Sequence, residues 1–353
     1  MGTTVKKHEI DMLHGSIWNK LPLFALPVAA TAILEQLFHA SDVAIVGNFT
    51  GDARTVAVAA VGANGPIIGL IVNLFIGIAL GANVVIANAI GCRDDNAVKR
   101  AVHTAIVFAV CGGAAVALLG QFIASPLLSI LNVPEDVFPY ALLYLRIYLL
   151  GMPVILLYNF EAAIFRSVGI TRMPLQALAV STVLNIGLDL IFVPILHWGV
   201  AGVAIATVIS QVISVFLVMR CLLRFDGAAK ISFRQIRLYR SEAVQMMQIG
   251  LPAGLQSMLF NISNVMVQSA VNSFGADVVA ASGNIGNFTY TAQNSVYHAA
   301  ITFTSQNLGA RRYDRIDRIF WGSCAAVCII GVPLSLLSTV FGPQLLGIYI
   351  ARS

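Results

Sequence analysis

The sequence predicts an all-α protein that crosses a lipid bilayer many times. Hydrophobic residues make up 58% of the chain and charged residues only 10%, whereas soluble domains carry about 25% charged residues. Apolar stretches of the length that a membrane helix needs, about 20 residues, recur along the chain. No barrel-like alternation interrupts them, and a chain in lipid must satisfy its own backbone groups, so we expect α-helices.

Hydropathy predicts nine membrane-spanning helices. They are expected near residues 21–47, 56–89, 97–123, 138–165, 174–195, 199–222, 243–272, 278–308 and 317–340. Six precede the longest polar segment and three follow it. We therefore divide the chain into a six-helix lobe (1–222), a basic cytoplasmic linker (223–242) and the first three helices of a second lobe (243–353).

The positions of Lys and Arg predict the orientation. Most of the 21 basic residues lie in the N-terminal segment and in every second loop, while the other side has only Arg54 and Arg352. By the positive-inside rule the N-terminus is cytoplasmic, in a multi-pass protein of the plasma membrane. This topology accounts for the net charge of +5, so we expect no nucleic-acid partner.

An internal repeat relates the two halves. Residues 26–43 (Leu-Pro to Ser-Asp-Val) correspond to residues 251–265 (Leu-Pro to Ser-Asn-Val), and residues 90–93 correspond to residues 308–311. An even number of spans separates the copies, so both enter the membrane in the same direction. Parallel repeats of this kind are typical of transporters that bind substrate between their halves.

Five segments carry a resemblance to a known family. They are Pro27, the Ser-Asp-Val-Ala-Ile-Val-Gly run at 41–47, Asn-Ile-Gly-Leu-Asp at 185–189, residues 199–207 and Gln-Asn-Leu-Gly-Ala at 306–310. The chain resembles the multidrug and toxic compound extrusion (MATE) transporters from about residue 17 to 342, in particular the bacterial drug and cation efflux branch. The resemblance implies two six-helix bundles, so this chain would end three helices short. We expect a monomer.

Two carboxylates within the predicted spans suggest a site for a charged species. A carboxylate at the bilayer centre costs about 2.5–3.5 kcal/mol, so Asp42 and Asp189 are functional candidates. Asp42 shares a helical stripe with Glu35 and His39, and Asp189 lies one turn after Asn185. The alternative is an interhelical hydrogen-bonding cluster that only holds the bundle together.

The resemblance assigns a role to these residues. It implies that Asp42, Asn185, Asp189 and Thr207 bind the coupling cation, either a proton or Na⁺. Oxygen ligands suit Na⁺, and paired carboxylates in a low-dielectric interior suit proton exchange. We expect no cofactor and no other metal.

The second half carries neutral polar stripes instead of acids. Together with two residues of the first helix they make up the candidate lining of the cavity: Glu35, His39, Asn261, Asn264, Gln268, Asn287, Tyr290 and Asn294. Such stripes equally well bind helices to each other. No acid lies in the expected seventh helix, so we expect the coupling chemistry in the first lobe.

Three further residues have predicted structural roles. Pro27 removes a backbone hydrogen bond and is the expected bending point of the first helix. Glu161 is expected to pair with Arg166 at the surface. Arg146 is expected to extend its charge to the membrane boundary.

The sequence thus predicts a cation-coupled antiporter that exports organic cations, such as drugs, from the cytoplasm by alternating access. No Walker phosphate loop is present, the five cysteines lack metal-binding spacing, and no soluble domain offers an enzyme site. A lipid or lipid-linked sugar flippase of the same superfamily is one alternative. A nontransporting scaffold or fragment is the other.

Overall fold

The computed structural model describes residues 9–51, 54–272 and 276–340, and in these residues every regular element is helical. The helices are α2 (Ile17–Phe49), α3 (Arg54–Gly91), α4 (Asp95–Ile130), α5 (Phe138–Leu150), α6 (Met152–Val168), α7 (Arg172–Phe192), α8 (Gly199–Leu223), the short 3₁₀ helix η2 (Phe233–Gln235), α9 (Arg240–Asn272), α10 (Ala276–Gly309) and α11 (Tyr313–Val340). The all-α fold class is confirmed.

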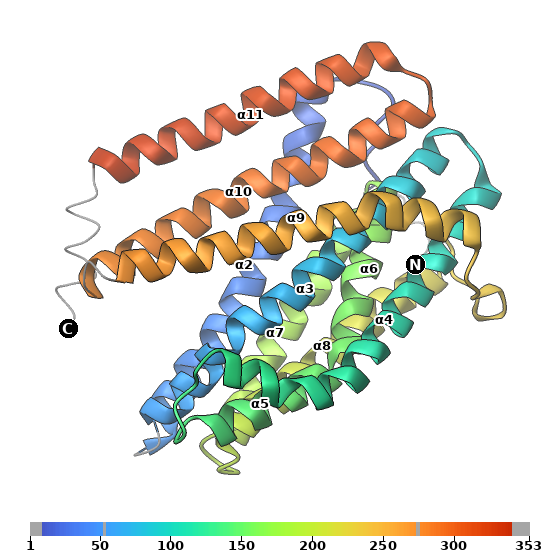
Figure 1. Ribbon diagram of the computed structural model, residues 1–353. Helices are drawn as coiled ribbons and strands as arrows, with labels where there is room; N and C mark the ends of the chain where they lie inside the picture. Colours follow the sequence, from blue (N-terminus) through green and yellow to red (C-terminus); the bar gives the residue numbers. More distant parts are fainter. Residues whose placement is uncertain (1–8, 52–53, 273–275, 341–353) are drawn as a thin grey trace.

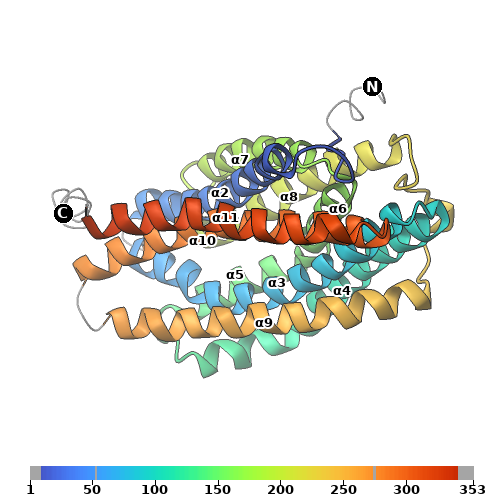
Figure 2. The ribbon, with the colours of Figure 1, turned by 90° about the horizontal axis from the view of Figure 1, so that it is seen from above.

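The helices form two groups that meet at one end. Helices α2 to α8 make one bundle, and α9, α10 and α11 lie beside α2 and α3 (Figure 1). Figure 1 shows that the two groups converge at the end where α10 gives way to α11 and diverge toward the opposite end. The view from above shows α9 along one side of the molecule and α11 lying over α2 and α10 (Figure 2).

In the part of the chain that the structure describes, each of the nine expected spans contains a helix or, at 138–165, the pair α5 and α6. Among the described residues, six helices are long and apolar enough to cross a membrane, or seven when α5 and α6 count as one bent span. Helices α9 and α10 are present at the expected positions but are not among them. Their neutral polar stripes lower the mean hydropathy, and these stripes need protein partners to cross a bilayer.

The expected helix at 138–165 is also not one straight helix. Helices α5 and α6 meet at a bend of 50° around Gly151. Pro153 lies in the first turn of α6 and has no backbone N–H, so the hydrogen-bond ladder is interrupted there. Gly151 lets α8 come close, because a Cβ at this position would lie 2.4 Å from Val208 Cγ2.

Paired glycines bring α3 and α9 into backbone contact. Gly77 and Gly81 of α3 face Gly250 and Gly254 of α9, so each helix contributes a Gly-x-x-x-Gly motif. A Cβ on Gly77 would lie 2.2 Å from Gly254 Cα, which is closer than real atoms approach. We call these four residues the glycine seam. Seams of small residues are typical of helix pairs in membranes. The predictions from the sequence did not include this motif.

A reciprocal contact joins α3 to α10. A Cβ on Gly91 would lie 2.0 Å from Gln306 O, and a Cβ on Gly309 would lie 2.1 Å from Asn88 O. The offset that relates residues 90–93 to residues 308–311 in the sequence repeat also relates the two glycines, and likewise Asn88 and Gln306. Each half therefore presents the same surface to the other, as in a two-fold interface.

The N-terminal segment, residues 9–16, touches both groups of helices. Ile10 N donates a hydrogen bond to Gly169 O at 3.1 Å in the first bundle. Asn307 Nδ2 donates to Met12 O at 3.1 Å, and Arg312 Nη1 donates to Leu13 O at 2.6 Å, both from the second group. The Met12 side chain is buried against Phe24 and Phe303. The segment therefore fastens the two groups where they converge.

Candidate cation-binding site

Asp42 is buried in the middle of the first bundle and is bound by Thr207. Its side chain is 1% exposed, and Thr207 Oγ1 donates a hydrogen bond to Asp42 Oδ2 at 3.0 Å. This bond joins α2 to α8. Both residues lie on the inner faces of long apolar helices, which explains their burial.

Asn185 and Asp189 complete the cluster from α7. Both are fully buried and lie one helical turn apart on the face that α7 turns toward α2 and α8. The side chains of both interact with the Asp42 carboxyl group. The structure thus brings together Asp42, Asn185, Asp189 and Thr207, which the resemblance had grouped from three separate helices.

Much of the cluster's hydrogen-bonding capacity is unused within the described structure. Asp42 Oδ1, both amide atoms of Asn185 and both carboxylate oxygens of Asp189 are buried without a hydrogen-bond partner of normal geometry. Two adjacent carboxylates in a low-dielectric interior cannot both be charged without compensation. Carboxylate, amide and hydroxyl oxygens suit a small hard cation, and the carboxylates equally suit a proton. The residues therefore fit either coupling ion.

The cluster adjoins two hollows in the first bundle. Asp42 lines a cleft of about 370 Å³ together with His39 of α2, Gly65 of α3 and the stacked rings of Tyr144 and Tyr148. Thr207 lines a smaller pocket of about 80 Å³, whose other lining residues include Glu35 and His39 of α2 and Gln211 of α8. The Asp42–Thr207 pair therefore stands between the cleft and the pocket.

The predicted polar residues of the second half lie elsewhere. Asn261 faces α3, because a Cβ on Gly69 would lie 2.7 Å from Asn261 Nδ2. Asn264 is exposed, Asn294 is half-buried, and the exposed Tyr290 stacks on Phe260 with ring centroids 5.1 Å apart. The side chains of Gln268 and Asn287 lie outside the described residues. The described members of this group do not line the Asp42 cleft.

Pro27 lies within α2, which continues as one helix from Ile17 to Phe49. Thr31 Oγ1 donates a hydrogen bond to Pro27 O at 2.8 Å. A hydrogen bond from a threonine hydroxyl to the carbonyl group four residues earlier often bends a helix. This bond is consistent with a bend at Pro27, and the bending role of Pro27 stays a prediction.

The prediction that Glu161 and Arg166 form a pair at the surface is wrong. Glu161 is fully buried, and both its carboxylate oxygens lack a hydrogen-bond partner in the described structure. Arg166 is half-buried, and no ion pair joins it to Glu161. Residues five apart lie on different faces of a helix, because neighbours on one face are three or four apart.

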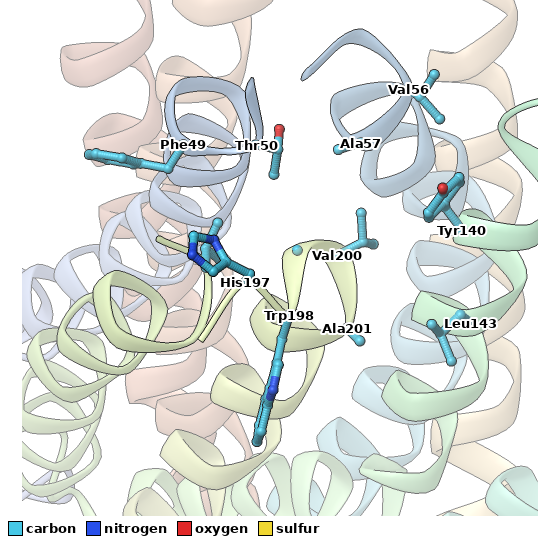
Figure 3. A pocket seen from close by; sticks show the side chains of 12 residues that line it. Phe49, Thr50, Val56, Ala57, Tyr140, Leu143, His197, Trp198, Val200 and Ala201 are labelled. Carbon is cyan, nitrogen blue, oxygen red and sulfur yellow. The ribbon is translucent and has the colours of Figure 1, made fainter. Parts of the chain in front are cut away.

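A further pocket, at the end of the first bundle where the two groups diverge, is separate from the cluster. It measures about 290 Å³ and is lined by the ends of α2 and α3, by α5 and by the turn between α7 and α8 (Figure 3). Phe49, Tyr140, His197 and Trp198 supply its aromatic side chains. Trp and Tyr are typical of membrane boundaries, so these residues mark where the bundle leaves the lipid.

Comparison with known proteins gives one family. The family model described as MatE matches residues 27–191 and 252–353, which together are well over half of the chain. The matched segments begin at Pro27 and Pro252, the two prolines of the internal repeat.

Similar proteins and solved structures align with almost the whole chain. It is 29% identical to the probable multidrug resistance protein YoeA of Bacillus subtilis, over 96% of this chain and 74% of the relative. It is 26% identical to the probable multidrug resistance protein YpnP of the same organism, over 97% and 76%. The structure superposes with a TM-score of 0.87 on "MATE in the bent conformation", at 22% identity over 95% of this chain and 75% of that one. At this identity the superposition shows the fold alone.

Proposed function

This chain belongs to the MatE family, and from that membership we propose that it exports organic cations from the cytoplasm in exchange for H⁺ or Na⁺. The family consists of membrane transporters of small organic molecules and not of enzymes. The plasma membrane, a cytoplasmic N-terminus and the coupling ion are parts of the proposal.

The observation that carries the proposal is the cluster of Asp42, Asn185, Asp189 and Thr207. A purely structural polar cluster is expected to satisfy its own hydrogen bonds, because unpaired buried groups are costly. Here five buried atoms remain without a hydrogen-bond partner of normal geometry in the described structure. Binding of a proton or Na⁺ would compensate the charge of the carboxylates and supply the missing contacts.

The arrangement of the two helix groups supports alternating access. The positive-inside rule places their convergent end, at Gly91 and Gly309, in the cytoplasm, so this conformation opens outward. Cation binding at the cluster lowers the negative charge beside the Asp42 cleft and favours release of a cationic substrate. Return to the inward-open state requires separation of the reciprocal contact and of the N-terminal segment.

The lining of the cleft indicates the class of substrate. Asp42 offers negative charge, and Tyr144 and Tyr148 offer aromatic faces for cation–π contact. Neither Lys nor Arg is among the described residues that line the cleft and its neighbouring pocket. This chemistry favours lipophilic cations over the phosphate groups that a flippase would have to bind.

Substitution of Asp189 tests the proposal. Asp189→Asn keeps the shape of the side chain and removes its charge, so export of a fluorescent organic cation should fall to the level of cells without the protein. Asp136→Asn, in an exposed loop, is the matched control and should export normally. Normal export by Asp189→Asn, with equal amounts of both variants in the membrane, would refute the coupling role. Vesicles with either a pH gradient or a Na⁺ gradient then identify the ion.

A further inference from the structure

Glu161 is a buried acid outside the coupling cluster, which consists of Asp42, Asn185, Asp189 and Thr207. The proposed antiport assigns no role to Glu161. It lies on α6, is 0% exposed, and neither carboxylate oxygen has a hydrogen-bond partner in the described structure. Its helix packs against α3, α4 and α8. Ile164, Val218 and Leu222 of α6 and α8 belong to the apolar cluster of this part of the bundle. An acid in such surroundings needs a specific reason.

A polar stripe on α8 leads from the coupling cluster toward Glu161. Thr207, Ser210 and Ser214 are spaced by three and four residues, and all three are buried. Thr207 bonds to Asp42, while the hydroxyl oxygens of Ser210 and Ser214 have no partner among the described residues. Two turns beyond Ser214 on the same face, Cys221 lies close enough to Glu161 to interact with it electrostatically. The stripe therefore extends from the cluster along α8, which packs against the helix of Glu161, toward the end of α8 that carries Cys221.

The surroundings of Glu161 fit a proton better than a metal ion. An unpaired buried charge costs several kcal/mol even after relaxation, whereas a protonated carboxyl group is neutral and can donate to a hydroxyl. Na⁺ would require several oxygen ligands. Glu161 lies close enough to Tyr158 of α6 and Cys221 of α8 for its charge to act on both groups. The other titratable residue of α6 is Arg166. Those on the helices that pack against α6 are Arg54, Asp95, Lys99, Arg100, His103, Cys111, Tyr140, Tyr144, Arg146, Tyr148, Arg172, Asp189 and Arg220, with Arg224 at the C-cap of α8.

We propose that Glu161 is a second proton-binding residue of the first bundle, which exchanges a proton with the Asp42–Asp189 cluster along the hydroxyl stripe of α8. This inference rests on the proposed antiport. In the transfer, the O–H bond of the Glu161 carboxyl group breaks and its proton passes through the hydroxyls, with water, to a carboxylate of the cluster. The Glu161 carboxylate then takes up a proton from the cytoplasmic side. No electron is transferred.

Infrared spectroscopy tests the protonation of Glu161 without a transport assay. The purified 353-residue chain in lipid is compared with Asp42→Asn/Asp189→Asn, in which the cluster cannot contribute. This double variant should still show a carboxylic acid C=O band at neutral pH that shifts in D₂O. Adding Glu161→Gln should remove the band, and adding Asp136→Asn should not. A spectrum unchanged by Glu161→Gln would overturn the proposal, and a Na⁺-sensitive carboxylate band at this position would assign the site to Na⁺ instead.

Transport measurements test the path between the sites. With a pH gradient, Glu161→Gln and Ser214→Ala should slow substrate export by on the order of 10²-fold, the lower range for loss of a positioned proton-transfer group. Ser129→Ala, an exposed serine at the end of α4, should export normally. Normal export by Glu161→Gln together with loss of export by Asp189→Asn would refute this inference alone. A wild-type chain that shows the infrared band but exports no cation would instead refute the proposed function.

Discussion

The two halves of the repeat share a backbone plan but differ in their chemistry. Asp42 of α2 and Asn264 of α9 occupy the same place in the repeated Ser-Asp-Val and Ser-Asn-Val sequences. Asp42 is buried and bound by Thr207, whereas Asn264 is exposed and neutral. The contacts at Gly91 and Gly309, in contrast, are reciprocal. The repeat therefore specifies the interface between the halves, while the cluster of Asp42, Asn185, Asp189 and Thr207 belongs to the first half.

The largest expected effect tests whether the two halves are chemically unequal. Asp42→Asn removes a charge from the cluster, so cation export should fall to background. Asn264→Ala, at the equivalent position, should leave export near the wild-type rate, because its side chain does not line the cleft. Uptake of a fluorescent cation by inverted vesicles measures both. Equal losses in the two variants would show that the second half also carries coupling chemistry.

The next effect concerns the glycine seam, where α3 of the first half packs against α9 of the second. Gly77→Ala places a methyl group against the backbone of α9, so it should lower the free energy of unfolding by about 1–3 kcal/mol, as overpacking does. Gly65→Ala is the matched control, because it lies in the same helix and its added Cβ meets no atom within 4 Å. Thermal unfolding in detergent compares the two. An equal midpoint for both variants would show that the halves separate easily at the glycine seam.

The sequence predicted the backbone better than the site. Apolar runs and charged loops place helices reliably, and the spacing of Asn185 and Asp189 puts them on one face. Periodicity alone does not say that α2, α7 and α8 meet, so Thr207 was grouped with Asp42 only through the resemblance. The glycine seam was readable from its Gly-x-x-x-Gly spacing.

Two differences from the predictions have simple physical causes. The bend at Gly151 arises because Pro153 interrupts a run that hydropathy treats as continuous. Glu161 was assigned to the surface because an arginine follows five residues later, although that spacing separates two residues around the helix axis. Whether an acid faces protein, lipid or water depends on the neighbouring helices, and hydropathy does not contain this information.

A smaller effect is expected where the N-terminal segment ties the halves together. Arg312→Ala removes the bond from the guanidinium group to Leu13 O, so backbone amides of residues 10–16 should exchange with deuterium faster. Arg318→Ala, an exposed residue on the following helix, is the control and should leave exchange unchanged. Unchanged exchange in Arg312→Ala would show that Met12 and Asn307 hold the segment without this arginine.

The smallest expected effect is the pH dependence of the same segment. Partial burial raises the pKa of Asp11, but hydrogen bonds from the backbone N–H groups of Leu13 and His14 and the charges of Lys20 and His14 outweigh it, so the pKa lies below its ordinary value. A lowered folded-state pKa means that the carboxylate stabilises the segment above the ordinary pKa and that this contribution is lost as the pH falls through the folded value. Because Asp11 is half exposed, the contribution should be on the order of 0.5 kcal/mol. Amide exchange of residues 12–15, corrected for the intrinsic effect of pH, should therefore accelerate in acid for the wild type and stay constant for Asp11→Asn. The same acid response in both proteins would assign the change to another group and leave Asp11 without a part in joining the two halves.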